Sequence, residues 1–355
     1  MTLNPVFGLD IVAKRLPTLI RKLETPPTSV VAVLDRGAKA VMHDALQAAL
    51  QKLNVNSKIL TWAPSEKRKS LAELEKLTQR MIGAGLDRGG LLIGVGGGIT
   101  TDMTGFAAAT YMRGVRWAAL PTTLLGMADA AIGGKTAVNL PQGKNLLGAF
   151  HMPQFVLADV ASLSTLAERD WSCGMGEVVK SGMIGSPSLL RRLEKASRPD
   201  LRSCGSDMLA IARATAKVKC TIVEEDPLEH GRRKLLNLGH TFGHAMETAA
   251  GPRRLAHGEA VALGMQCALD MAVDQGLAKA QYRQRMLELF EHCGLPVKYP
   301  GKLATVAELA RLIGRDKKKA KSSVDVILPL QAAECVIVPG QAPRDLALQI
   351  HRSFG

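Results

Sequence analysis

A strand-like run that leads directly into three glycines is the feature that most constrains the fold of this 355-residue chain. Residues 90–95 are mostly apolar, Gly96–Gly98 follow, and a helical pattern begins at Thr101. Glycines at such a turn let backbone amides approach a pyrophosphate at a helix N-terminus. A dinucleotide fingerprint would need a third glycine where the chain has Ile99 or Thr101. The pattern predicts a strand–turn–helix unit, in which the glycines either bind phosphate or only make a tight turn.

Strand-like and helix-like segments alternate through the first half of the chain. We expect strands at residues 29–34, 57–62, 90–95 and 116–120, and helices at residues 39–53, 70–83 and 101–112. Such alternation is typical of a mostly parallel sheet that binds ligands at the carboxyl ends of its strands. We therefore predict an α/β nucleotide-binding domain, Rossmann-like, over residues 1–166.

Helical periodicity dominates from residue 167 onward. We expect helices at residues 186–196, 207–225, 258–275 and 280–293, and a late strand pair at residues 324–328 and 335–338. The second domain, residues 167–355, is therefore predicted to be mainly α-helical.

Composition limits the classes of partner. The net charge of +14 suits nucleic acid, a membrane surface or small anionic substrates, but only 4% of residues are aromatic and could stack on bases. No apolar run reaches the roughly 18 residues of a membrane helix, and the start of the chain lacks the apolar core of a signal peptide. We therefore expect a cytoplasmic protein that binds neither nucleic acid nor membranes, with its six scattered cysteines reduced.

Three histidines stand close together late in the chain. In a helix, His240 and His244 would lie one turn apart on one face, and His257 follows from the next segment. This is metal-site spacing, and imidazoles with a carboxylate suit zinc or cobalt. Spacing alone equally allows histidines that pack or cap a helix.

Charged residues in apolar or glycine-rich surroundings mark further candidates. Lys135 and Lys144, each beside glycine, suit a phosphate or carboxylate in a loop-rich pocket, although the glycine spacing of a P-loop is absent. Glu177 and Lys180 stand three residues apart in an apolar stretch, where a buried charge needs a partner or a metal. The alternative is an ion pair on the surface of a helix. Asp35 could bind a ribose or cap a helix. Residues 315–321 are first interpreted as a solvated basic loop.

Taken together, these motifs resemble the 3-dehydroquinate synthase family over most of the chain. The motifs are GGG with Asp102, Gly105 and Phe106, then YMRG, PTTLL, GGKTAVN, GKN, GEVVK, LNLGHTFGHAxE and HGEAV. The resemblance implies a homodimeric enzyme of the shikimate pathway, which leads to aromatic amino acids. It would use NAD and a divalent metal, zinc or cobalt, to convert 3-deoxy-D-arabino-heptulosonate 7-phosphate into 3-dehydroquinate and phosphate. NAD would be recycled.

The resemblance also assigns roles to individual residues. It implies the metal ligands Glu177, His240 and His257 and the catalytic residues His244, Lys180, Lys135, Glu229 and Asn237. His244 would handle the proton of a substrate hydroxyl. Residues implied to bind the substrate are Arg113, Asp129, Lys144, Asn145, Lys219, Arg233, Lys317 and Lys318. Residues implied to contact NAD are Asp35, Glu66, Lys69, Gly97, Gly98, Asp102, Thr122, Thr123, Lys135, Lys144 and Thr165.

Three alternatives stay open beside this assignment. One is a sibling cyclase acting on another sugar phosphate, although Lys219, Arg233 and Asn237 favour a carboxylated substrate. Another is a metal-dependent polyol dehydrogenase, which would release NADH and no phosphate. The third is a basic protein that binds nucleic acid without catalysis. Thr101, where the family commonly has glycine, is expected to crowd the pyrophosphate.

Overall fold

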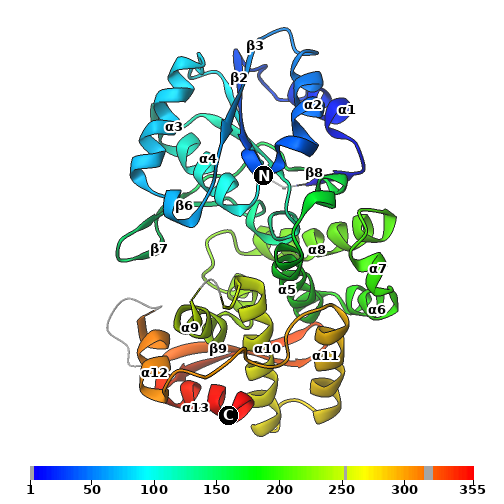
Figure 1. The fold of residues 1–355 in the computed structure, drawn as a ribbon, viewed down its shortest axis with the longest axis vertical. Coiled ribbons are helices and arrows are strands. Elements are labelled where there is room, and N and C mark those ends of the chain that lie inside the picture. The colour runs from blue at the N-terminus through cyan, green and yellow to red at the C-terminus, as the bar shows by residue number, and fades with distance from the viewer. Residues whose placement is uncertain (1–3, 252–253, 316–322) are drawn as a thin grey trace. The chain divides into compact units, whose positions relative to one another are not determined.

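A computed structural model describes residues 4–251, 254–315 and 323–355. The chain forms two compact units (Figure 1). Unit 1 comprises residues 1–167 and 203–216, and unit 2 comprises residues 168–202 and 217–355. Within the described residues, no helix combines the length and the apolar character needed to cross a membrane.

Unit 1 is built on a four-stranded parallel sheet in the order β3 (Asn56–Trp62), β2 (Ser29–Asp35), β4 (Leu91–Gly96) and β5 (Arg116–Pro121). β1 (Val6–Gly8) pairs in parallel with β8 (Leu157–Asp159). The helices include α1 (Val12–Arg21), α2 (Lys39–Leu50), α3 (Leu71–Gly83) and α4 (Gly98–Thr110). The predicted Rossmann-like alternation is therefore confirmed.

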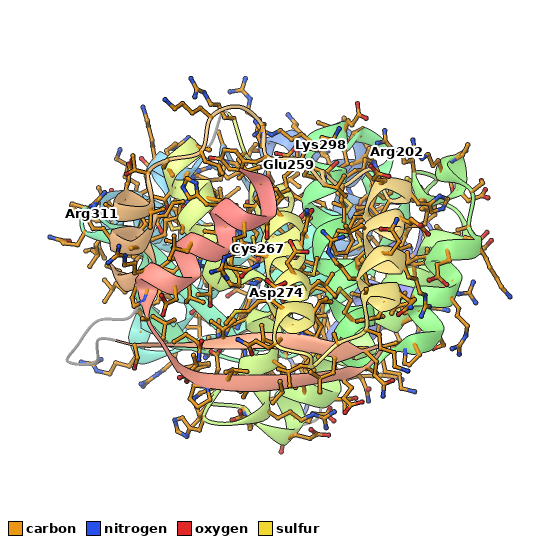
Figure 2. All side chains as sticks on the ribbon, turned by 90° about the horizontal axis from the view of Figure 1, so that it is seen from below. Arg202, Glu259, Cys267, Asp274, Lys298 and Arg311 are labelled. Carbon is orange, nitrogen blue, oxygen red and sulfur yellow. The ribbon has the colours of Figure 1, made fainter. Side chains whose placement is uncertain are left out.

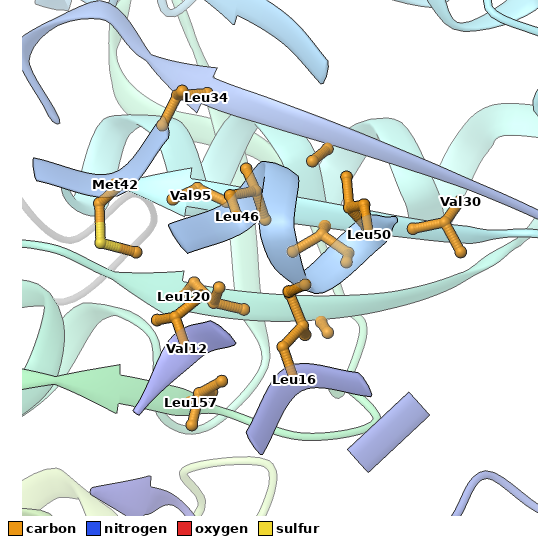
Figure 3. Packing of buried hydrophobic residues seen from close by; sticks show 14 of the residues in the cluster. Val12, Leu16, Val30, Leu34, Met42, Leu46, Leu50, Val95, Leu120 and Leu157 are labelled. Carbon is orange, nitrogen blue, oxygen red and sulfur yellow. The ribbon is translucent and has the colours of Figure 1, made fainter. Parts of the chain in front are cut away.

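The core of unit 1 lies between α1, α2 and one face of the sheet (Figure 3). On α2, Met42, Leu46 and Leu50 recur every four residues, so they share the face that packs against the strands. β2 is an uninterrupted apolar run with buried side chains on both faces, as expected for a central parallel strand. Burial of each leucine side chain contributes about 1.5–3 kcal/mol.

A hairpin of β6 (Lys135–Leu140) and β7 (Gly143–Phe150) occupies the segment that was predicted to be a loop. The two strands pair antiparallel, from Lys135 opposite Phe150 to Leu140 opposite Gly143. Glycines and asparagines hide the alternating pattern here, because only Thr136, Ala137 and Val138 are buried in β6. The loop prediction is therefore wrong for Lys135 and Lys144, which lie on strands.

Unit 2 is mainly helical, as predicted. Its principal helices are α5 (Glu168–Gly185), α9 (His240–Ala250) and α10 (His257–Asp274), and its antiparallel hairpin is β9 (Val324–Gln331) with β10 (Glu334–Gln341). The others are α6 (Pro187–Lys195), α7 (Arg198–Leu201), α11 (Ala280–His292), α12 (Val306–Arg315) and α13 (Pro343–Phe354), whereas α8 (Ser206–Glu225) belongs to both units. α13 lies across α10 beside Cys267 (Figure 2), and Ser353 donates to Asp270.

Close backbone contacts bring α5, α9 and α10 together. A Cβ on Gly264 of α10 would lie 1.9 Å from the Gly239 carbonyl oxygen before α9. A Cβ on Gly176 of α5 would lie 2.6 Å from the Gly258 carbonyl oxygen. Any side chain at these positions would force the helices apart, because the neighbouring atoms belong to the backbone. Glycine therefore sets the spacing of the three helices.

Gly264→Ala should destabilise unit 2, because its methyl group overlaps the Gly239 carbonyl oxygen. Overpacking of this kind costs about 1–3 kcal/mol. Gly83→Ala is the matched control, since a Cβ there meets nothing within 4 Å and alanine favours a helix by up to about 1 kcal/mol over glycine. Urea unfolding should show a lower midpoint for Gly264→Ala and an unchanged or higher one for Gly83→Ala. Equal midpoints for both variants would contradict the packing account.

Candidate functional site

Three helices of unit 2 present titratable side chains to one another. Glu177 and Lys180 lie one turn apart on α5, His240 and His244 lie one turn apart on α9, and His257 is the first residue of α10. The contacts of α9 and α10 through Gly264 fix the separation of their histidines. The structure therefore brings together five residues that the sequence singles out.

The distances among these side chains suit a shared metal ion. The Nε2 atoms of His240 and His257 lie 3.7 Å and 3.6 Å from Glu177 Oε1. Ligand atoms about 2.0–2.2 Å from a tetrahedral zinc ion lie about 3.3–3.6 Å from one another. The three donors are one carboxylate and two imidazoles, a set that suits zinc or cobalt. The residues present therefore fit a divalent transition metal.

The other nitrogen of each imidazole is already engaged. His240 Nδ1 lies 3.2 Å from the Leu238 carbonyl oxygen, and His257 Nδ1 lies 3.2 Å from Glu247 Oε2. Both acceptors favour a proton on Nδ1, so Nε2 is the nitrogen that faces the Glu177 carboxylate and that would bind a metal once it carries no proton. The two rings are thus held in the orientation that metal ligands need.

Glu177 carries its charge in a buried position. Its side chain is 1% exposed and that of Lys180 is 2% exposed, and the two form an ion pair. Burial alone would raise the pKa of Glu177, but the Lys180 ammonium and the imidazoles of His257 and His240 outweigh it and hold that pKa well below its usual range. The alternative of a surface helix pair is therefore wrong.

The two imidazoles next to Glu177 differ in basicity. Burial and the nearby Lys180 ammonium lower the pKa of His240, so its ring is neutral near pH 7. Burial also disfavours the charged form of His257, but hydrogen bonding to Glu177 and Glu247 outweighs burial and raises its pKa to about 9. The neutral His240 ring needs no proton loss before it can bind a metal.

His244 sits beside both of these histidines. Its ring centroid lies 5.1 Å from that of His240 and 5.8 Å from that of His257. His244, Glu247 and His257 also have ligand atoms within 4.8 Å of one another. The described residues thus offer two overlapping donor sets that share His257, and only the first contains the buried Glu177.

Other predicted residues of unit 2 lie on α8 and in the segment between α8 and α9. Asn237 Nδ2 donates to Glu229 Oε1 at 2.9 Å, and Glu229 has a left-handed backbone with φ of +64°. Arg233 is 2% exposed and Lys219 on α8 is 7% exposed. The Asp226 carboxylate accepts from the backbone N–H of Arg233 and so shapes this turn. Two of these residues are thus buried cations and two form a polar pair.

The predicted nucleotide contacts of unit 1 gather at the carboxyl ends of β2, β4 and β5. Gly97 precedes α4, and the backbone N–H of Thr122 donates to the Gly96 carbonyl oxygen at 3.0 Å. Asp35 accepts from the Gly37 N–H at 2.8 Å, so it caps the turn after β2. Thr101 is buried and its hydroxyl donates to the Gly98 carbonyl oxygen, so its side chain lies against the first turn of α4.

Lys69 connects two groups of predicted residues in unit 1. It is 4% exposed, and its Nζ lies 2.5 Å from Asp102 Oδ2 and donates to Asn145 Oδ1. Lys135 and Lys144 are exposed on the hairpin, and Asp129 lies in the turn Gly126–Ala130 before it. The hairpin is therefore linked to the predicted nucleotide site by a buried ammonium.

The remaining predicted residues lie in turns or outside the described residues. Arg113 follows the C-terminal end of α4 and has a left-handed backbone with φ of +68°. Thr165 is exposed at the end of the turn Val160–Thr165, which contacts α2 and β1. Lys317 and Lys318 lie outside the described residues.

A separate pocket of about 400 Å³ lies in unit 2 at the start of α5, beside α7 and the end of α11. Its charged groups have protein partners: Arg202 Nη1 lies 2.8 Å from Glu168 Oε1, and Arg198 Nη2 donates to the Glu291 carbonyl oxygen at 2.7 Å. None of the three metal-ligand candidates lines this pocket. The chemistry of the chain therefore does not centre on it.

Two residues of these clusters had no predicted role. Glu247 orients His257, and Asn139 joins Glu66 to Asn145. Both stand inside motifs that the sequence singles out, HAxE and GGKTAVN. The motifs could have pointed to both residues, but their roles depend on contacts that form only in the tertiary structure.

Comparisons with known families agree with this geometry. Residues 59–173 match the family described as 3-dehydroquinate synthase N-terminal, and residues 174–319 match 3-dehydroquinate synthase C-terminal. A 3-dehydroquinate synthase of Symbiobacterium thermophilum is 36% identical over 96% of this chain and 94% of its own length. One from Ruegeria sp. is 37% identical over 97% of this chain and 93% of its own length.

Solved structures share the fold. A 2-deoxy-scyllo-inosose synthase complexed with carbaglucose-6-phosphate, NAD+ and Co2+ superposes with a TM-score of 0.86, at 25% identity over 98% of this chain and 96% of that chain. ValA, a 2-epi-5-epi-valiolone synthase from Streptomyces hygroscopicus with NAD+ and Zn2+ bound, gives 0.85, at 26% identity over 99% of this chain and 97% of that chain. Given the two family matches and these full-length relatives, the chain belongs to the 3-dehydroquinate synthase family.

Proposed function

We propose that this chain converts 3-deoxy-D-arabino-heptulosonate 7-phosphate into 3-dehydroquinate and phosphate, the activity of its family in the shikimate pathway. The observation that carries the proposal is the convergence of Glu177, His240 and His257 in a chain whose full-length relatives are 3-dehydroquinate synthases. The overall conversion oxidises and later reduces the same substrate carbon, and it eliminates phosphate between the two steps. Because the hydride removed in the oxidation is returned in the reduction, no net NADH is formed. A final aldol step closes the carbocycle.

Glu177, His240 and His257 would hold a divalent metal, zinc or cobalt, and the turn around Gly97 with Asp35, Thr122 and Thr123 would hold NAD. The other residues that we assign to NAD are Glu66, Lys69, Gly98, Asp102, Lys135, Lys144 and Thr165. When bound, NAD would accept and return a hydride, and the metal would polarise substrate oxygen atoms. The known structures of 2-deoxy-scyllo-inosose synthase and ValA hold NAD+ with Co2+ or Zn2+, which supports both assignments.

The chain's own residues would position the substrate and move its protons. His244 would take and return the proton of the oxidised hydroxyl, because an imidazole can both accept and donate a proton. Lys180 would keep the Glu177 carboxylate ionised through their buried ion pair. Glu229 and Asn237 would bind substrate hydroxyls as a preformed hydrogen-bonded pair.

The fixed cations would recognise the two anionic ends of the substrate. We assign the carboxylate to the buried Lys219 and Arg233, and the phosphate to Lys135, Lys144 and Asn145 on the hairpin. Further substrate contacts are expected from Asp129, Arg113, Lys317 and Lys318. The buried Lys219 and Arg233 distinguish this proposal from a sibling cyclase whose substrate lacks a carboxylate. A homodimer and a cytoplasmic location stay predictions of this proposal.

Metal-loaded protein with NAD+ should release phosphate from the heptulosonate phosphate with no net rise in absorbance from NADH. A hexose 6-phosphate, which lacks the carboxylate, is the control substrate and should release at least about a hundredfold less phosphate, because it offers no carboxylate for Lys219 and Arg233 to bind. Phosphate and NADH are measured in the same reaction. Absence of phosphate release from folded, metal-loaded protein would sink the assignment, and net NADH would favour a dehydrogenase.

Glu177→Ala and His257→Ala should each abolish retention of zinc or cobalt after dialysis, because each removes one of three donors. His244→Ala should retain the metal and lose about 10²–10⁴-fold in rate, the usual contribution of a general acid or base. Metal content is measured by elemental analysis on protein whose fold is verified by circular dichroism. Equal metal loss in all three variants would refute this division of roles.

A further inference from the structure

Asn139, near the end of β6, makes hydrogen bonds to three residues in two other segments of unit 1. Its backbone N–H donates to the Lys69 carbonyl oxygen at 2.8 Å. Its side-chain Nδ2 donates to Glu66 Oε1 at 2.7 Å, and its Oδ1 accepts from the backbone N–H of Asn145 at 2.9 Å. One asparagine therefore ties the turn end of the hairpin to its own β7 strand and to the segment before α3.

The buried Lys69 completes this network. Its ammonium lies between Asp102 of α4 and Asn145 of β7. The side chains of Lys69 and Asp102 are 5% and 20% exposed, so this ion pair is partly shielded from water. We call the set Glu66, Lys69, Asp102, Asn139 and Asn145 the clasp.

Asn145 is the residue of the clasp whose conformation most needs support. Its φ is +54°, in the left-handed region, where a non-glycine residue is less stable than in its usual conformations. The Asn139 Oδ1 atom accepts the Asn145 N–H and so holds that backbone in place. In this conformation the Asn145 side chain reaches Lys69. Loss of the Asn139 amide would therefore weaken the contact between Asn145 and Lys69 as well.

We propose that Asn139 is a positioning residue that makes the binding of NAD and of phosphate by this protein cooperative. The inference rests on the proposed function, which assigns Glu66, Lys69 and Asp102 to NAD, Asn145 to phosphate and Lys144 to both. A phosphate bound at Lys144 and Asn145 restricts the conformations of the hairpin. Through the hydrogen bonds of the clasp, the side chains of Lys69 and Asp102 are then restricted as well. NAD then binds to a site that is already ordered, so the second ligand loses less conformational entropy.

The direct test is the effect of inorganic phosphate on the affinity for NAD+. Isothermal titration of the full chain, with chloride replacing phosphate at constant ionic strength, gives the dissociation constant of NAD+ with and without phosphate. For the wild type we expect saturating phosphate to tighten NAD+ binding by at least about fivefold, within the usual range of coupling between sites. By reciprocity, NAD+ should tighten phosphate binding by the same factor.

Asn139→Ala should reduce this factor to less than about twofold while the thermal melting profile stays close to that of the wild type. Asn139→Ser also removes the side-chain contacts with Glu66 and the Asn145 N–H, but it keeps a polar side chain. It replaces the alanine variant in the test if that variant does not fold. Asn139→Asp keeps the oxygen that accepts from Asn145 but sets a second carboxylate against Glu66, so its factor should lie between those of Asn139→Ala and the wild type. Asn56→Ala is the matched control, because the side-chain amide of this exposed asparagine on β3 donates to the Ala84 carbonyl oxygen, which is not part of the clasp.

The possible outcomes distinguish a failure of the clasp from a failure of the proposed function. If the wild type binds both ligands but phosphate does not tighten NAD+ binding, the cooperative role of the clasp is overturned and the proposed function still stands. An unchanged factor in Asn139→Ala or Asn139→Ser would overturn the role of Asn139. A wild type that binds neither NAD+ nor phosphate would overturn the proposed function and the clasp with it.

Discussion

The close approach of α5, α9 and α10 is the constraint on which the candidate site depends. Each of the three proposed metal ligands adjoins a glycine that makes this approach possible: Gly176 precedes Glu177, Gly239 precedes His240, and Gly258 follows His257. A Cβ at any of these glycines would lie within 2.6 Å of backbone or of a packed side chain from a neighbouring segment. The same residues that let the helices touch therefore set the distances among the donor atoms.

The second constraint is electrostatic. Glu177 is a carboxylate that is almost wholly removed from water, and such a charge is costly unless it is paired. Lys180 supplies one positive charge, and a bound divalent cation would supply the rest. Removal of one partner of a buried ion pair typically costs about 3–5 kcal/mol, whereas a well-packed apolar pair is often as stable. The fold alone therefore gives no reason for this pair, but metal binding does.

Sequence patterns predict much of this fold because the parallel strands are uninterrupted apolar runs and the helices repeat every 3.6 residues. They miss the β6 and β7 hairpin, because its glycines and asparagines resemble a loop. Spacing brings His240, His244 and His257 together but cannot decide which of them bind a metal, since His240 and His244 share one helix face. Glu247 and Asn139 stand inside sequence motifs, but the motifs do not give their roles, because each acts through residues distant in sequence.

Two overlapping sets of donors make the position of the metal ion the central question. Crystals of the cobalt-loaded protein, measured on both sides of the cobalt absorption edge, would locate the ion directly. The account predicts one anomalous peak about 2.0–2.2 Å from Glu177 and from Nε2 of His240 and His257. A peak coordinated by His244, Glu247 and His257, with Glu177 outside its coordination shell, would contradict it.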